Sequence, residues 1–255
     1  MTERNQDNQY VLQSVANALD ILDLLTTHEE LSVPEVSRLL GLGKSSVFRL
    51  LATLEDRHFV RKTDAAKYRL GMKLASMGNT VLNRMEIIQY AHPYLMEMTR
   101  LSGETTNLVV WDRGTKVRFV DRVLSSHAIR MDSSIGSSLD AHLVACGKVL
   151  LAYQTKEFQE AYMNSVTFQQ LTPYSITTAE ALYKELERIV RVGHAADKEE
   201  SELGLSCIAA PIFDSSDTVI AAVSISGPLQ RIGENRLKNS ALVKQTALDI
   251  SNSMR

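Results

Sequence analysis

The sequence predicts an α+β protein in two parts: a helix-turn-helix followed by a β-hairpin, and then an antiparallel sheet with helices packed on it. Apolar residues repeat with helical period in the segments before residue 57. Beyond residue 105, short β-prone runs alternate with polar turns and helical segments. With 44% hydrophobic and 23% charged residues, the composition is that of a globular protein rather than a disordered or fibrous one.

Three short helices are expected in the N-terminal part. The first lies over 14–25, with one face formed by Val15, Ala18, Leu19, Leu22 and Leu25. Ser32 and Glu35 have capping-box spacing, which predicts the start of a second helix that ends at Gly41. Its expected buried stripe is Val36, Leu39 and Leu40. A third helix is expected over 44–56, burying Val47, Leu50, Leu51 and Leu54. The second and third helices, joined by a tight turn with glycines, form a helix-turn-helix.

The third helix carries short hydroxyls and cations away from its apolar stripe, which suits entry into a DNA major groove. These residues are Lys44, Ser45, Ser46, Arg49 and Thr53. Arg49 can reach the O6 and N7 atoms of a guanine. Two short β-prone runs around residues 63–66 then predict a hairpin, or wing. Its cations are available for the phosphate backbone: Arg61, Lys62, Lys67 and Arg69.

The charge distribution supports the same surface. Residues 1–37 hold seven acidic residues and one basic residue, whereas residues 38–73 hold nine basic and three acidic ones. A basic block inside folded sequence is typical of a phosphate-facing surface. A solvated charged face is the alternative on charge alone.

The chain resembles a known family over nearly its whole length. LSVPEVSRLLGLGKSSVFRLLATLEDRHFV is similar to the DNA-binding region of IclR-type regulators. Three later blocks follow in the family's order and spacing: AHPYLMEMTRLSGETTNLVVWDRGTKVRFVDRV, GSSLDAHLVACGKVLLAY and HAADKEESELGLSCIAAPIFDSSDTVIAAVSISGP. The resemblance implies a bacterial transcription regulator that binds DNA with its winged head and a small-molecule effector with a GAF-like C-terminal domain.

We expect four segments: a flexible tail over 1–9, a winged helix-turn-helix over 10–70, a linker helix over 71–88 and the effector-binding domain over 89–255. The linker's apolar stripe is Leu74, Met77, Val81, Leu82 and Met85. Periodicity alone would allow this helix to belong to either domain's core. The resemblance implies that it helps to pair two heads, as a homodimer or a dimer of dimers. A head of this size makes few base contacts, so two heads on a palindromic operator are expected.

Polar residues interrupt the apolar runs 205–213 and 218–226. If residues 214–217 form a simple hairpin turn, Cys207 lies opposite Ser224, and Leu205 lies opposite Ser226. Side chains two apart share a face with their direct partners. Cys207, Ser224 and Ser226 should therefore cluster on one face of the sheet. A loop one residue longer or shorter would break this geometry, and serines bonding locally on a solvated face are the alternative.

By resemblance, this cluster belongs to the effector site. The matching residues are Asp197, Leu205, Cys207, Ser224 and Ser226. Further matches are the backbone of Ala145 and Cys146 and the apolar wall at Ala128 and Met131. The chain departs from the family at Asp140, where a proline is usual, and at Leu143, Val144 and Cys146, where smaller or more polar residues are usual. The resemblance therefore implies the fold but does not fix the size of the pocket or the identity of its ligand. Because none of the matching residues is Arg or Lys, we expect a small polar ligand with at least two oxygens, such as an organic acid, aldehyde or lactone-like compound.

A metal site or nucleophile–base set could be imagined from His142, His194, Asp197 and Cys207. No two of them have motif spacing, so we expect no metal, no cofactor and no catalysis. The two cysteines, Cys146 and Cys207, are expected to be free thiols. The polar N-terminus and the lack of a long apolar run predict a cytoplasmic protein without a membrane partner. The rivals are an enzyme that turns over its ligand and an architectural DNA-binding protein.

Overall fold

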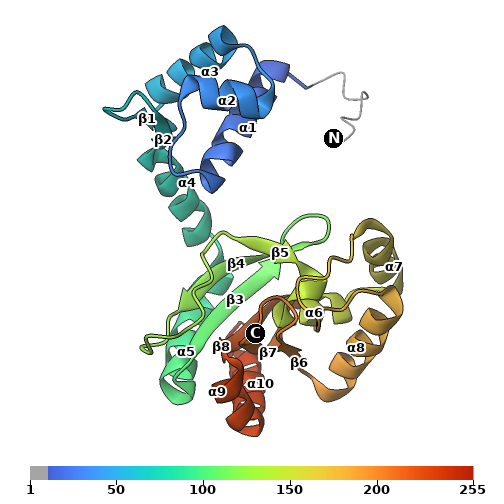
Figure 1. Ribbon diagram of the computed structural model, residues 1–255. Coiled ribbons are helices and arrows are strands. Elements are labelled where there is room, and N and C mark those ends of the chain that lie inside the picture. Colours follow the sequence, from blue (N-terminus) through green and yellow to red (C-terminus); the bar gives the residue numbers. More distant parts are fainter. Residues whose placement is uncertain (1–10, 255) are drawn as a thin grey trace. The chain divides into compact units, whose positions relative to one another are not determined.

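The computed structural model describes residues 11–254, which divide after Arg84 into two compact units (Figure 1). The tail expected over residues 1–9 lies outside the described residues. Each unit has its own buried core, so each is treated below by itself.

The first unit is a winged helix-turn-helix, as predicted. Its elements are α1 (Gln13–Thr27), α2 (Val33–Leu40), α3 (Lys44–Asp56), β1 (Val60–Lys62), β2 (Tyr68–Leu70) and α4 (Met72–Asn83). The capping box forms at the start of α2, where the backbone N–H of Ser32 donates to Glu35 Oε2 at 2.8 Å and its hydroxyl donates to the same oxygen at 2.6 Å. Gly41 ends the helix with a φ of 66°, a left-handed conformation that glycine adopts without strain.

The apolar stripes of the first unit are only partly buried. In α1 the buried residues are Ile21 and Leu25, whereas Val15 and Leu19 are 52% and 55% exposed. Leu39, which we expected to be buried, is 46% exposed. The stripes are wider than the surface that α2, α3 and the short hairpin can cover. The unit therefore keeps apolar side chains on its surface.

The linker helix is shorter than expected. α4 ends at Asn83 instead of residue 88, and a separate helix, α5, begins at Glu86. Met77 and Val81 on α4 are 50% and 61% exposed. Within its own unit, this helix therefore has an apolar stripe without a covering layer.

The second unit is built on one six-stranded antiparallel sheet with the order β5-β4-β3-β8-β7-β6. The strands are β3 (Thr105–Trp111), β4 (Lys116–Val123), β5 (Ser138–Asp140), β6 (Ala195–Lys198), β7 (Leu205–Phe213) and β8 (Val219–Pro228). Helices α5 (Glu86–Ser102) and α10 (Arg236–Ser253) pack on one face, and α6 (Ala145–Ala152) packs on the other (Figure 1). The remaining helices are α7 (Lys156–Ser165), α8 (Ala179–Val192) and α9 (Leu229–Glu234).

The mostly apolar pattern with small residues over 138–153 predicts one helix, but the segment forms three elements. Strand β5 comes first, a 3₁₀ turn over Ala141–Leu143 follows, and α6 begins only after the extended residue Val144. A Cβ on Gly147 would lie 2.3 Å from the carbonyl oxygen of Ala141. The chain folds back tightly on itself here, and only glycine allows that approach. Helices α5, α7 and α9 and strands β5 and β6 were not predicted from the sequence.

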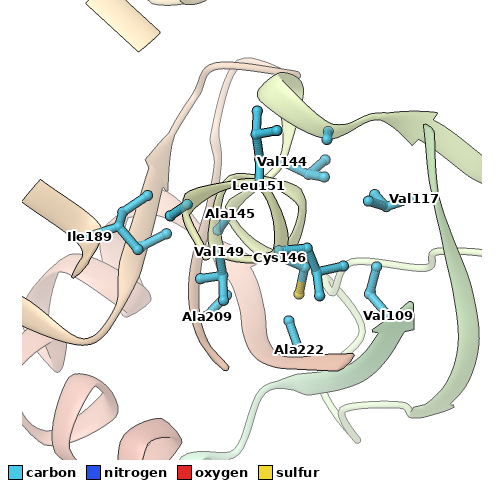
Figure 2. Packing of buried hydrophobic residues seen from close by; sticks show 14 of the residues in the cluster. Val109, Val117, Val144, Ala145, Cys146, Val149, Leu151, Ile189, Ala209 and Ala222 are labelled. Carbon is cyan, nitrogen blue, oxygen red and sulfur yellow. The ribbon is translucent and has the colours of Figure 1, made fainter. Parts of the chain in front are cut away.

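Small residues on the sheet let α6 approach it closely. Figure 2 shows Val149 beside Ala209, and Cys146 above Ala222 and Val109, within one buried apolar cluster. Because α6 is buried on all sides, its position is fixed by this packing. Its first turn consequently lies over the part of the sheet that carries the polar residues of β7 and β8.

The β7–β8 hairpin has a different register from the simple one expected. Cys207 pairs with Ser226, and Ala209 pairs with Ser224, two residues away from the expected partners. The turn pairs Phe213 with Val219, and a bulge between Phe213 and Ile212 leaves Ile220 of the facing strand as one further, unpaired residue. The turn and the bulge each shift the register by one residue. The total shift of two residues leaves every side chain on the face of the sheet that was expected. Cys207 and both serines share one side of the sheet, as predicted.

Candidate functional site

The recognition helix α3 presents its polar residues to solvent. Lys44, Ser45, Ser46, Arg49 and Thr53 are all exposed, while Val47, Leu51 and Leu54 are buried against the rest of the head. Thr53 donates its hydroxyl to the backbone oxygen of Arg49 at 2.8 Å, so that hydrogen is already used within the helix. The exposed side of α3 also carries Phe48, which is 53% exposed. Phe48 was not among the predicted DNA-contacting residues, which are all hydroxyls or cations.

The four cations of the wing differ in how free they are to contact a phosphate. Arg61 pairs with Arg69 across the β1–β2 ladder, so the two guanidinium groups extend from the same face. Lys62 is exposed and its ammonium lies 5.8 Å from the centre of the Tyr68 ring. Lys67 forms an ion pair with Glu30 at 3.3 Å. Lys67 is therefore the least free of the four wing cations to meet a phosphate.

In the second unit, a cavity of about 200 Å³ opens between the polar face of β7 and β8 and the first turn of α6. Seven of the nine residues expected at the effector site line it: Met131, Ala145, Cys146, Leu205, Cys207, Ser224 and Ser226. The cavity wall also includes Phe119, Leu139, Val144, Leu171, Ser201 and Glu202. No Arg or Lys belongs to this lining, as far as the structure describes the chain.

A hydrogen-bonded polar network holds the two serines that line the cavity. Asn107 Nδ2 donates to Ser224 Oγ at 3.3 Å and to Ser226 Oγ at 3.2 Å. Ser133 Oγ in turn donates to Asn107 Oδ1 at 2.6 Å. Asn107 was missed because strand β3 pairs with β8 across more than a hundred residues of chain, and no local pattern in the sequence predicts such a pairing.

The start of α6 adds backbone donors to this network. The first N–H groups of an α-helix have no acceptor within the helix, and Val144, at the N-cap position, offers no side-chain acceptor. Ala145 and Cys146 in this first turn line the cavity. Hydroxyls from below and backbone N–H groups from above can therefore hold the oxygens of a small molecule, while the apolar wall holds its carbon skeleton.

Comparison with known proteins identifies both units. The IclR helix-turn-helix domain matches residues 14–64, and the C-terminal domain of the bacterial transcriptional regulator IclR matches residues 79–252. The chain belongs to the IclR family of bacterial transcriptional regulators.

Individual relatives agree along the whole length. The transcriptional regulator XynR of Escherichia coli K12 is 34% identical over 96% of this chain and 98% of its own. The crystal structure of Thermotoga maritima IclR is 32% identical, with a TM-score of 0.78, over 95% of this chain and 98% of that one. An IclR homologue from Microbacterium hydrocarbonoxydans, solved as a complex with 4-hydroxybenzoate, has the same fold at 24% identity, with a TM-score of 0.80 over 95% of this chain and 99% of that one.

This IclR-family protein is thus a DNA-binding transcription regulator with a C-terminal effector-binding domain, and its relatives are regulators rather than enzymes. Among residues 11–254, no helix is long and apolar enough to cross a membrane. Within the same range, no group of three or more His, Cys, Asp or Glu side chains could hold a metal ion.

Two expected effector residues lie outside the cavity lining. Ala128 is exposed, on the loop after β4. Asp197 is 1% exposed and lies behind the cavity wall, where it pairs with Cys207 in the ladder and accepts from the Glu200 backbone N–H at 2.8 Å. Asp197 therefore supports the turn that carries Ser201 rather than lining the cavity itself.

Burial keeps the two cysteine thiols of the cavity wall uncharged. It raises the pKa of the Cys146 thiol to about 12, although a hydrogen bond with Ser224 opposes the rise. Burial, followed by the nearby charge of Asp197, raises the pKa of the Cys207 thiol well above its ordinary value. Both cysteines are therefore protonated near neutral pH and are weak nucleophiles. This chemistry suits binding by neutral donors better than covalent turnover of the ligand.

Proposed function

We propose that this regulator binds a palindromic DNA operator with two heads, and that a small polar metabolite in the effector cavity changes that binding. One observation carries the proposal: the cavity between α6 and the β7–β8 hairpin joins backbone donors and hydroxyls to an apolar wall, and no Arg or Lys of residues 11–254 lines it. The ligand class that fits is an organic acid, aldehyde or lactone-like compound with at least two oxygens. Such a regulator works beside the chromosome, in the cytoplasm.

The exposed polar face of α3 supports the DNA half of the proposal. We assign base contacts to Lys44, Ser45, Ser46, Arg49 and Thr53, and phosphate contacts to Arg61, Lys62, Arg69 and, more weakly, Lys67. Arg49→Ala should weaken binding to an operator recovered by in vitro selection by about 1–3 kcal/mol and relax its sequence preference. Arg113→Ala, an exposed cation on the turn between β3 and β4, is the control. Unchanged affinity and selectivity for Arg49→Ala would refute the assignment.

The exposed apolar residues of α1 and α4 support pairing of the heads. Val15, Leu19, Met77 and Val81 all leave apolar surface open within the first unit. Such surface on a DNA-binding head is best covered by a second copy of the chain, as a homodimer or dimer of dimers. Effector binding would then act by changing the relative placement of two heads, a coupling between distinct sites.

The effector half is tested by a thermal-shift screen against small organic acids, aldehydes and lactones, followed by calorimetry and gel shift with the hit. Replacing both Ser224 and Ser226 with Ala should cost about 2–3 kcal/mol of ligand affinity and leave DNA binding without ligand nearly unchanged. Ser251→Ala, which removes a buried hydroxyl behind the other face of the sheet, is the matched control. Full ligand affinity in the double variant would place the effector elsewhere.

A further inference from the structure

A second cavity, separate from the effector cavity, lies along α8 and the edge strand β6. It measures about 580 Å³ and is called the α8 groove here. Five cations line it: Lys184, Arg188 and Arg191 on α8, Lys198 on β6, and Arg236 at the start of α10. Residues 184, 188 and 191 follow helical spacing, so one side of α8 turns all three toward the groove.

The carboxylates of the α8 groove are already neutralised. Glu185 accepts both of its bonds from Arg188, each at 2.7 Å. Glu200 accepts from Lys148 Nζ at 2.6 Å through both oxygens, and Lys148 is itself completely buried. Arg188 and Lys148 thus neutralise the two carboxylates of the groove. The other cations that line it are therefore an excess of positive charge.

Three of the groove's cations have no acidic partner. Lys184 is paired with Glu180 at 2.6 Å, but Arg191, Lys198 and Arg236 form no ion pair within residues 11–254 and are exposed. Burial, with the nearby charges of Arg188, Lys244 and Arg236, lowers the pKa of His194, as expected beside a positive region. Cations on three different elements that surround one hollow are arranged to meet more than one negative charge of a ligand.

The edge strand argues for a small molecule rather than a peptide. An extended peptide would add to β6 through the backbone groups of that strand. Lys148 Nζ already donates to the carbonyl oxygen of Ala196 in β6 at 3.2 Å, which removes one acceptor. The volume lies in the usual range of small-molecule sites. We propose that the α8 groove is a second ligand site, for a small multivalent anion such as a phosphorylated or polycarboxylate metabolite.

The wall between the α8 groove and the effector cavity is made of two short segments. Leu171 lines the effector cavity and Tyr174 the groove; Glu200 lines the groove, and Ser201 lines the cavity. The two segments are tied together, because Ser175 Oγ donates to the carbonyl oxygen of Glu200 at 2.6 Å. An anion that holds the segment before Ser201 therefore also holds the wall of the effector cavity, so the two ligands affect each other's affinity reciprocally.

Calorimetry on the full chain tests the site with pyrophosphate and citrate as separate probes, at an ionic strength fixed with sodium chloride. We expect saturable binding of at least one probe in the millimolar range or tighter. Replacing both Arg191 and Arg236 with Glu should weaken that binding at least about tenfold. Lys198→Gln, a milder change on another element, should weaken it about threefold. Arg113→Glu, which reverses an exposed charge outside the groove, should change it less than twofold.

The relative affinity of the two probes separates a phosphate ligand from a polycarboxylate one. Hydrogen exchange of residues 196–205 should slow when the better probe saturates wild type, and should not slow in the Arg191/Arg236 variant. No saturable binding of either probe by 10 mM (roughly the weakest affinity of a useful site) would overturn the proposal. An equal loss in Arg113→Glu would also overturn it, because net charge rather than the groove would then be responsible. These readouts need neither operator nor effector, so they stand or fall separately from the proposed function.

Discussion

Phe48 is an exposed aromatic side chain on a helix whose other exposed residues are polar. It lies one turn from Lys44 and beside Arg49. In a major groove, the methyl group of thymine is the feature that an apolar side chain reads. We infer that Phe48 contacts such a methyl group, because its aromatic side chain is exposed on the DNA-facing side of α3.

Replacing thymines of the operator with uracil, one at a time, tests this contact. At one position, loss of the methyl should weaken wild-type binding about threefold, as expected for one buried carbon. Phe48→Ala should be weakened overall and should no longer respond to that replacement, since the two changes remove the same contact. A variant that responds to uracil as wild type does would contradict the assignment.

Asp197 makes a pH-dependent contribution to stability. Burial raises the pKa of its carboxyl above the ordinary value of 3.8. The charge of Lys148 and the hydrogen bonds from Glu200 and Ser201 lower this pKa, but burial is the larger effect. Between the unfolded and folded pKa values the native state binds more protons, so stability falls as pH rises through that window. The free energy of unfolding of Asp197→Asn, minus that of wild type, should therefore increase from pH 4 toward pH 7.

Urea unfolding at four pH values measures this difference. Asp64→Asn, an exposed change on the wing, gives the generic effect of such a substitution. A difference for Asp197→Asn that stays constant or decreases with pH would show that another group is responsible.

Among the elements, α6 depends on a close backbone approach. The Cβ of Gly147→Ala would collide with the backbone of Ala141, so we expect a loss of about 1–3 kcal/mol in stability and a distorted effector cavity. Gly78→Ala on α4 meets nothing within 4 Å and should stabilise its helix by up to about 1 kcal/mol. Calorimetric unfolding of both variants measures the contrast. A neutral Gly147→Ala would mean that the turn can move away.

The exposed stripe of α4 makes a prediction about pairing. Replacing Met77 and Val81 with Glu should dissociate a fragment of residues 1–88 toward monomer and lower its operator affinity, because each charge would be buried in the proposed dimer contact. Ser76→Glu on the same helix but outside that stripe is the control. Sedimentation of the three fragments decides between them, and an unchanged fragment dimer for the double variant would exclude α4 from the contact.

Helices with clear end signals could be predicted from the sequence, and elements made by tertiary contact could not. The range of α3 was predicted correctly, and the capping box and Gly41 located both ends of α2. The segment around Val144 has an apolar, small-residue pattern that is equally consistent with a continuous helix. Its break comes from the fold-back onto Ala141, which the local sequence does not reveal. β6 was missed because its four residues form a strand only by pairing with β7.

At the scale of the whole molecule, positive charge is concentrated in one part of the head, residues 38–73, which hold nine basic and three acidic residues, although the chain as a whole has a net charge of only −2. Affinity for any DNA should therefore fall steeply with salt. Lys62→Ala should weaken all sequences alike and reduce the slope of log K against log salt by about one. Lys67→Ala should have less effect, because Glu30 already pairs with it. Equal slopes for wild type and Lys62→Ala would remove the wing from the phosphate contacts.

The effector site was only partly predictable from the sequence, because some of its residues come together only when the whole sheet assembles. Strand parity placed Cys207, Ser224 and Ser226 on one face as predicted, but only because the turn and the bulge each shift the register by one residue and together preserve the face. Asn107 and Leu171 come from distant parts of the chain and join the site only through the assembled sheet and its covering loops. Resemblance to the family contributed Ala145 and Cys146, which periodicity alone would have left in a featureless helix.

The bulge in the β7–β8 hairpin has a consequence for insertions and deletions. With the observed turn, an unbroken ladder would put Ile225 opposite Cys207 and turn both serines to the other face of the sheet; the extra residue, Ile220, restores the frame. Loss of Ile220 itself would merely regularise the ladder. Loss of one residue between Ile220 and Ser224 would instead exchange the inner and outer faces of the strand. A one-residue deletion is therefore tolerated at the bulge, whereas the same deletion between the bulge and the serines turns the cavity-lining side chains to the opposite face of the sheet.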